Sequence, residues 1–255
     1  MLTAENVEVS FGGVRAVAGV SINLEAEEVV GLVGPNGSGK TTFLNALSGI
    51  VKASGSMRID GKLVPFGRPR QVWRAGVARV FQAPQTFLEG LSVIDNVLLS
   101  SDQLSMRGLI GSTVGRVPMW KHERNRWRQA MTVLEIAGLA DVAEAPADSL
   151  TYGHQRMLEL CRALAGNPRV LLLDEPSAGL NDAETAELGR LLHELRHRRI
   201  AMLLIDHKID FVDTLCDRVV VLDLGQVIAE GVGEQVWRNP LVMSAYLGVT
   251  ADAAD

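Results

Sequence analysis

The feature that most constrains this chain is the stretch from Gly34 to Thr42, which reads GPNGSGKTT. It fits the pattern G-x-x-x-x-G-K-[ST] at every fixed position. An apolar run at 29–33 comes before it and predicts a buried strand, and apolar residues at helical spacing follow it at 43–50. A glycine-rich loop between a strand and a helix is the setting in which this pattern binds phosphate groups.

Each residue type in this loop suits the phosphates of a nucleotide. Glycines take positive φ and lack a Cβ, so the backbone can close around an anion at a helix N-terminus. Lys40 supplies a full charge for the terminal phosphates, and Thr41 supplies a hydroxyl for Mg²⁺. The predicted nucleotide-binding residues of the loop are Gly34, Asn36, Gly37, Ser38, Gly39, Lys40, Thr41 and Thr42.

Two adjacent acids follow another predicted buried strand at 170–173. Carboxylates beside a buried strand cost solvation free energy unless a cation or a partner is near. We therefore expect Asp174 to hold the hydration shell of Mg²⁺ and Glu175 to align or deprotonate a water that attacks the γ-phosphate. The alternative is a strand-end helix cap, which Pro176 allows.

Two more strands are predicted to end in polar side chains, at 77–81 and 200–205. Ligands bind at the carboxyl ends of strands in α/β sheets. Gln82 is therefore a candidate switchable ligand of Mg²⁺, and His207 a candidate contact of the γ-phosphate. Together with Lys40 and Glu175, they form the predicted catalytic set.

The N-terminal residues alternate between apolar and polar at 7–11 and 20–24, around a Gly12-Gly13 turn, which predicts an antiparallel hairpin. Phe11 ends the first strand, and its spacing fits a ring stacked on a nucleotide base as well as it fits a core residue.

The segment 91–160 lacks strong strand patterns and reads as a helical subdomain. We expect a helix start at Ser92, a loop over 107–118, and a second anion-binding helix terminus where Thr151 caps a helix and Gly153 allows close approach. The basic run 121–128 favours a solvated helix face over a nucleic-acid patch. The organisation predicted is one domain, 1–255, whose nucleotide-binding core comprises 1–90 and 161–255 and whose helical subdomain is 91–160.

Composition excludes several classes of protein. The chain has 255 residues, of which 47% are hydrophobic, and a net charge of −5, so it carries no overall basic field for nucleic acid. No apolar stretch approaches the length of a membrane span, and we expect no secretory signal at the N-terminus. Cys161 and Cys216 lie among apolar residues, which favours reduced core thiols of a cytosolic protein over the alternative of a structural disulfide.

The order of these features resembles the ATP-binding subunit of ABC transporters over essentially the whole chain: the phosphate loop, Gln82, the sequence LTYGHQ at 150–155, the acidic strand end, SAGLN at 177–181, and His207. The stretches at 11–17, 178–181 and 239–248 are similar to the ATPases of branched-chain amino acid importers. The fold implied is an α/β P-loop NTPase core of ABC type, with an N-terminal antiparallel β subdomain and an inserted α-helical subdomain. Departures from the family pattern include Thr151 in place of Ser and Lys208 in place of Asp.

The resemblance also implies roles and partners. Phe11 would stack on adenine, and Gln82 would reach Mg²⁺ and couple to the membrane subunits. Thr151 and Gly153 would contact the γ-phosphate of ATP held by a second ATP-binding subunit, identical or paralogous, in a nucleotide sandwich. The implied partners also include two integral membrane permeases and, indirectly, a periplasmic solute-binding protein, but no nucleic acid. The expected location is cytoplasmic, on the inner face of the cell membrane.

We therefore expect an ATPase that powers uptake of branched-chain or other amino acids. The same role for urea or short amides remains an alternative, as does a soluble ABC ATPase of DNA repair or translation. A GTPase is disfavoured because no Asn-Lys-x-Asp sequence occurs. A regulator that binds nucleotide without hydrolysis is disfavoured by Glu175 and His207.

Overall fold

The computed structural model describes residues 1–82, 88–100 and 116–247, with the side chains of 116–123 left out. The chain forms two compact units. The first comprises Met1–Gln82 and Arg169–Asp255, and the second comprises Ala83–Pro168. The boundaries predicted from the sequence, at 90/91 and 160/161, remain a prediction about how the domain is subdivided.

The first unit contains a four-stranded antiparallel sheet in the order β2-β1-β4-β5. In β1 the apolar residues Val7 and Val9 are buried between more exposed neighbours, as the alternation predicts. The predicted hairpin is confirmed, since β1 and β2 pair antiparallel up to Phe11 and Val14. The strands are β1 (Leu2–Phe11), β2 (Val14–Leu24), β4 (Ser54–Ile59) and β5 (Lys62–Leu63).

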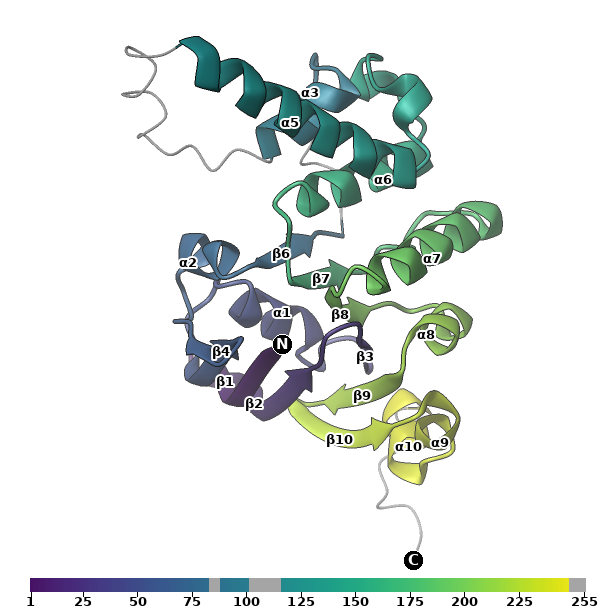
Figure 1. The fold of residues 1–255 in the computed structure, drawn as a ribbon. Helices are drawn as coiled ribbons and strands as arrows, with labels where there is room; N and C mark the ends of the chain where they lie inside the picture. Colours follow the sequence, from purple (N-terminus) through teal and green to yellow (C-terminus); the bar gives the residue numbers. More distant parts are fainter. Residues whose placement is uncertain (83–87, 101–115, 248–255) are drawn as a thin grey trace, which may run out of the picture. The chain divides into compact units, whose positions relative to one another are not determined.

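The same unit contains a six-stranded sheet in the order β10-β9-β3-β8-β7-β6 (Figure 1). All neighbours are parallel except β10 and β9. Every residue of β3, β7 and β8 is buried, which explains why their sequences are apolar throughout except at Asp174, the last residue of β7. The parallel strands place their carboxyl ends at one edge of the sheet. The strands are β3 (Val29–Val33), β6 (Val77–Val80), β7 (Val170–Asp174), β8 (Ala201–Ile205), β9 (Arg218–Asp223) and β10 (Gln226–Gly231).

Helix α1 contributes to a core shared by the two sheets. Phe43, Leu44 and Leu47 are fully buried and join apolar side chains of both sheets in one cluster. Helices α9 and α10 pack beside β10 (Figure 1). The helices of this unit are α1 (Lys40–Leu47), α2 (Pro69–Arg74), α7 (Asp182–Arg196), α8 (Ile209–Leu215), α9 (Gly233–Trp237) and α10 (Pro240–Leu247).

The second unit is helical in the part that the structure describes. Ser92 starts α3 as predicted, because its hydroxyl accepts the Asp95 N–H at 3.1 Å. The predicted loop is wrong at 116–118, which form the first turn of α5, a position where proline is tolerated; residues 107–115 lie outside the described ones. The elements are α3 (Val93–Ser100), α5 (Arg116–Ile136), η1 (Ala140–Val142), η2 (Ala147–Ser149) and α6 (Tyr152–Leu164).

The basic run lies on α5. Arg124 and Arg128 are exposed there, as expected for a solvated helix face. Arg126 is half-buried and donates to the carbonyl oxygen of Leu98 at 3.0 Å, so it helps to join α5 to α3. A structural contact thus accounts for Arg126, and the solvated face stays a prediction for the exposed arginines.

Candidate nucleotide-binding site

The loop between β3 and α1 packs closely against the backbone of β9 and of β2 at two glycines. A Cβ on Gly34 would lie 2.0 Å from the carbonyl oxygen of Leu222, and one on Gly39 would lie 2.4 Å from that of Ala16. Both have positive φ, 144° and 104°. At Gly37, by contrast, a Cβ would meet no atom within 4 Å. The loop therefore has one side that is packed and one side that is open to a ligand.

Two side chains of the loop fit a phosphate group. The hydroxyl oxygen of Ser38 is buried and has no hydrogen-bond partner among the described residues. Lys40 is also buried, and its Nζ donates to the carbonyl oxygens of Gly34 and Pro35 at 2.7 and 2.9 Å. A phosphate would supply an acceptor for the Ser38 hydroxyl and a counter-charge for the Lys40 ammonium.

Two opposing effects act on the pKa of the Lys40 side chain. Burial lowers the pKa of its ammonium, while the nearby carboxylates of Glu175 and Asp174 raise it. Burial is the larger effect, so an additional negative charge at the loop would favour the protonated form. An anion such as a nucleotide phosphate meets that requirement.

The predicted catalytic residues of three strand ends come together. The Oε2 atom of Glu175 accepts from Nε2 of Gln82 at 2.6 Å, and its Oε1 atom lies 3.1 Å from Nε2 of His207. Glu175 has a φ of 49°, and its N–H donates to the carbonyl oxygen of Ile205 at 2.8 Å. The adjacent strands β6, β7 and β8 thus build a carboxylate held between an amide and an imidazole.

Asp174 has a partner that the sequence did not reveal. Its Oδ2 atom accepts from Nη2 of Arg79 at 2.6 Å, and both side chains are 5% exposed. The same guanidinium donates to Oδ1 of Asn45, on α1, at 2.6 Å. Arg79 therefore neutralises the carboxylate predicted to face Mg²⁺ and ties it to the helix that follows the phosphate loop.

The donor set is compatible with Mg²⁺ bound chiefly through phosphate oxygens and water. No group of three or more His, Cys, Asp or Glu side chains suited to a metal occurs within the described ranges. Mg²⁺ usually uses one or two carboxylates together with substrate phosphates and water. The residues that would hold it are Thr41, Gln82 and Asp174, and Thr41 is exposed.

Tyr246 is a further contact of the phosphate loop that sequence reasoning missed. The N–H of Gly34 donates to the Tyr246 hydroxyl oxygen at 2.9 Å, across 212 positions of sequence. Burial raises the pKa of this phenol, although the Gly34 N–H opposes the shift. Its ring meets Trp237 edge to face, with centroids 6.4 Å apart. Helix α10 therefore helps to hold the start of the loop.

The remaining predicted site residues lie on other elements. Phe11 is 52% exposed at the end of β1, so the alternative of a core residue is wrong. In the second unit, Thr151 caps α6 by accepting the N–H of His154 at 3.3 Å, and Gly153 is buried in the first turn. The predicted cap is present, and its contact with nucleotide remains a prediction.

The fold and site define a P-loop protein built to bind and cleave a nucleoside triphosphate. The family model described as "ABC transporter" matches residues 17–178. The chain belongs to this ABC transporter family and is an ATP-binding, ATP-hydrolysing subunit. Among the described residues, no helix has both the length and the apolar character needed to cross a membrane.

The similarity to known proteins extends over almost the whole chain. The high-affinity branched-chain amino acid transport ATP-binding protein LivG of Escherichia coli (strain K12) is 39% identical over 97% of this chain and 98% of its own length. The corresponding protein BraF of Pseudomonas aeruginosa is 36% identical over the same shares. A crystal structure of the ADP conformation of an ATP-binding cassette of an ABC transporter superposes with a TM-score of 0.82, at 30% identity, over 97% of this chain and 98% of that one.

Proposed function

We propose that this chain powers the import of branched-chain or other amino acids by hydrolysing ATP against partner membrane permeases. Two kinds of support carry the proposal. Two relatives that are 36–39% identical to this chain over almost their full length are named for branched-chain amino acid transport. The observation that best supports ATP cleavage is the position of the Glu175 carboxylate between Gln82 and His207, at the carboxyl ends of the strands, where the phosphate loop begins.

In the proposed reaction a water attacks the γ-phosphorus, and the bond to the β–γ bridging oxygen breaks to give ADP and phosphate. Glu175 accepts the proton of that water, and His207 holds the carboxylate and the γ-phosphate in place. Lys40 and the N–H groups of the loop stabilise negative charge on the phosphates. Bound Mg²⁺, held by Thr41, Gln82 and Asp174, would add positive charge beside the β- and γ-phosphates.

We propose that two ATP-binding subunits, identical or paralogous, enclose two nucleotides. The open side of the loop at Gly37 leaves room for a contact from outside the first unit. The capped start of α6, with Thr151 and Gly153, offers N–H groups and a positive helix end that suit a γ-phosphate. The exposed ring of Phe11 offers a surface on which adenine can stack.

The proposed assembly includes two integral membrane permeases and, through them, a periplasmic solute-binding protein. The chain would then act on the cytoplasmic, inner face of the membrane, with no nucleic-acid partner. Transport of urea or short amides by the same machinery is the second candidate, because the solute does not contact this subunit. A soluble ABC ATPase of DNA repair or translation is the third.

Reconstitution tests the proposal. The chain, its two permeases and its binding protein are placed in liposomes loaded with ATP and Mg²⁺, and uptake of labelled leucine is compared with uptake of labelled urea. We expect leucine uptake that requires ATP, and none with the Glu175→Gln variant. Uptake of urea without uptake of leucine would mean that the transported solute is urea and not an amino acid. Failure of the chain to associate with any permease pair would contradict the transport role.

A further inference from the structure

The loop that follows β7, residues 175–181, is held by the residues that follow β8. At its start the N–H of Glu175 donates to the carbonyl oxygen of Ile205. Asp206, which is 6% exposed, accepts the backbone N–H of Ser177 at 3.1 Å and its hydroxyl at 2.7 Å. These charge-assisted bonds fix the first half of the loop.

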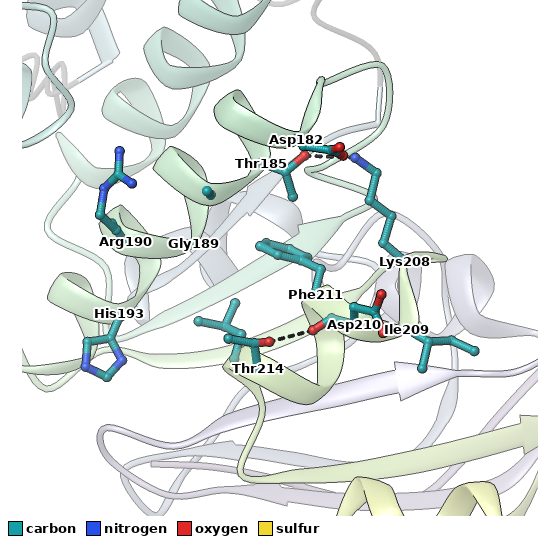
Figure 2. Close-up of a pocket in the computed structure, with 12 residues that line it drawn as sticks. Asp182, Thr185, Gly189, Arg190, His193, Lys208, Ile209, Asp210, Phe211 and Thr214 are labelled. Carbon is teal, nitrogen blue, oxygen red and sulfur yellow. Dashed lines mark hydrogen bonds between the residues drawn. The ribbon is translucent and has the colours of Figure 1, made fainter.

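Lys208 fixes the second half. Its Nζ atom donates to the carbonyl oxygen of Leu180 at 3.0 Å and to the hydroxyl oxygen of Thr185 at 2.8 Å. Figure 2 shows this side chain extending from the segment before α8 to Thr185 on α7, at one end of a cavity between the two helices. Thr185 in turn donates to the carbonyl oxygen of Asn181 at 2.8 Å. The ammonium therefore ties the end of the loop to the first turn of α7.

Helix stability does not explain a lysine at this place. The N-terminus of a helix carries partial positive charge, so a cation beside it is unfavourable. Helix α7 is already stabilised there by Asp182 and by a complete capping box between Asn181 and Glu184. The ammonium of Lys208 is instead stabilised by its hydrogen bond to the carbonyl oxygen of Leu180, which belongs to the loop.

His207 lies between these two anchoring residues. Asp206 and Lys208 are also joined directly, because the Lys208 N–H donates to Oδ1 of Asp206 at 3.0 Å. Holding the segment 206–208 against the loop therefore fixes the imidazole relative to Glu175, to which it lies at 3.1 Å. A shift of either segment would change that distance.

We propose that Lys208 is a positioning residue for ATP hydrolysis, which holds the loop after β7 so that Glu175 and His207 stay aligned. The inference rests on the proposed function, and it assigns to this lysine a role in the chemical step without contact to the nucleotide. Because Lys208 does not touch the phosphate loop in the structure, its loss should affect kcat while leaving ATP binding unchanged.

The first test compares Lys208→Met with Lys62→Met, a matched control on the exposed strand β5. In the complex with permeases, we expect Lys208→Met to lower kcat about tenfold or more, since small misplacements near a reacting group have effects of that order. The Kd for a non-hydrolysable ATP analogue should stay within about twofold of wild type. Lys208→Arg should recover part of the loss, and Lys62→Met should match wild type.

The second test measures the loop itself by hydrogen exchange. In Lys208→Met, amides of residues 177–181 should exchange faster, including the Leu180 N–H that donates to Ser177. Thr185→Val, which removes one acceptor of the ammonium, should lower kcat less than Lys208→Met does. The two effects should not add fully, because both changes release the contact between Lys208 and Thr185, and only the bond from Thr185 to the Asn181 carbonyl oxygen is lost in addition.

The outcomes separate this inference from the proposed function. The positioning role would be overturned if Lys208→Met had the kcat of the wild type, or if it lost ATP affinity by the same factor as kcat. The proposed function would be unaffected by either result, as long as the wild-type protein hydrolyses ATP. Unchanged exchange of residues 177–181 would overturn it as well. Absence of ATP hydrolysis by the wild-type complex would overturn the proposed function and this inference together.

Discussion

Replacing Glu175 by Gln tests the chemistry at the strand ends. The amide has nearly the same shape as the carboxylate, so its oxygen can accept from Gln82, as Oε2 does at 2.6 Å, while its NH₂ group can only donate toward His207, which lies 3.1 Å from Oε1. It cannot accept a proton from the attacking water. Neither hydrogen bond involves the phosphate loop, and the change removes a negative charge near Lys40 and the phosphates, so binding of ATP should persist.

The expected size of the effect follows from the role of the carboxylate. Loss of a positioned general base typically costs 10²–10⁴-fold in rate. At 1.36 kcal/mol for each factor of ten, this range is about 2.7–5.4 kcal/mol of transition-state stabilisation. We therefore expect kcat to fall by ~10²-fold or more, with little change in ATP affinity.

Phosphate release measures kcat, calorimetry measures ATP affinity, and light scattering measures mass with and without ATP. The variant should accumulate as an ATP-bound dimer, because the nucleotide that joins the two copies is not cleaved. Glu187→Gln, at an exposed position of α7, is the control for a change of charge. A fall in kcat of less than about threefold would refute the assignment of Glu175 as the general base, and a variant that stays monomeric with ATP would count against the sandwich.

Three other substitutions test separate parts of the structure. Tyr246→Phe removes one hydrogen bond to the phosphate loop and should raise the Kd for ATP about 2–10-fold by calorimetry, and an unchanged Kd would remove Tyr246 from the site. Gly39→Ala should lower the free energy of unfolding by ~3 kcal/mol or more in urea denaturation, because of its positive φ and its clash with a carbonyl oxygen at 2.4 Å; wild-type stability would show that the loop adapts. Asn181→Ala breaks the capping box of α7 and should cost ~0.5–2 kcal/mol in the same assay, whereas a cost near zero would mean that the cap is not needed.

The sequence predicted the elements whose patterns are local. The run at 29–33 is continuous and apolar because β3 is buried on both faces, and the alternation near Val7 and Val9 reflects one buried face of β1. The sequence also placed Gln82, Glu175 and His207 at strand ends. Their meeting follows from the neighbouring positions of β6, β7 and β8 in the sheet.

Contacts that depend on distant parts of the chain could not be read from these patterns. Tyr246 reaches Gly34 across 212 positions, and nothing in the spacing of α10 indicates this. Arg79 is one polar residue in a short strand, and its ion pair with Asp174 exists only because β6 lies beside β7.

The C-terminal end of α7 was also not evident from the sequence pattern. Helix α7 ends at Arg196, and Arg199 takes a φ of 63° after it. That left-handed conformation is common just beyond a helix C-terminus, but it is usual for glycine rather than arginine. The sequence pattern gave no indication of this conformation at Arg199.

The central claim is that the loop from Gly34 to Thr42 binds the triphosphate whose cleavage drives the transporter. The most direct measurement is the rate of ATP hydrolysis by the complex of this chain with its permease pair, for wild type and for Lys40→Ala. We expect the variant to lose hydrolysis almost completely, because the cation of the loop is gone. Equal rates for the two proteins would contradict the claim.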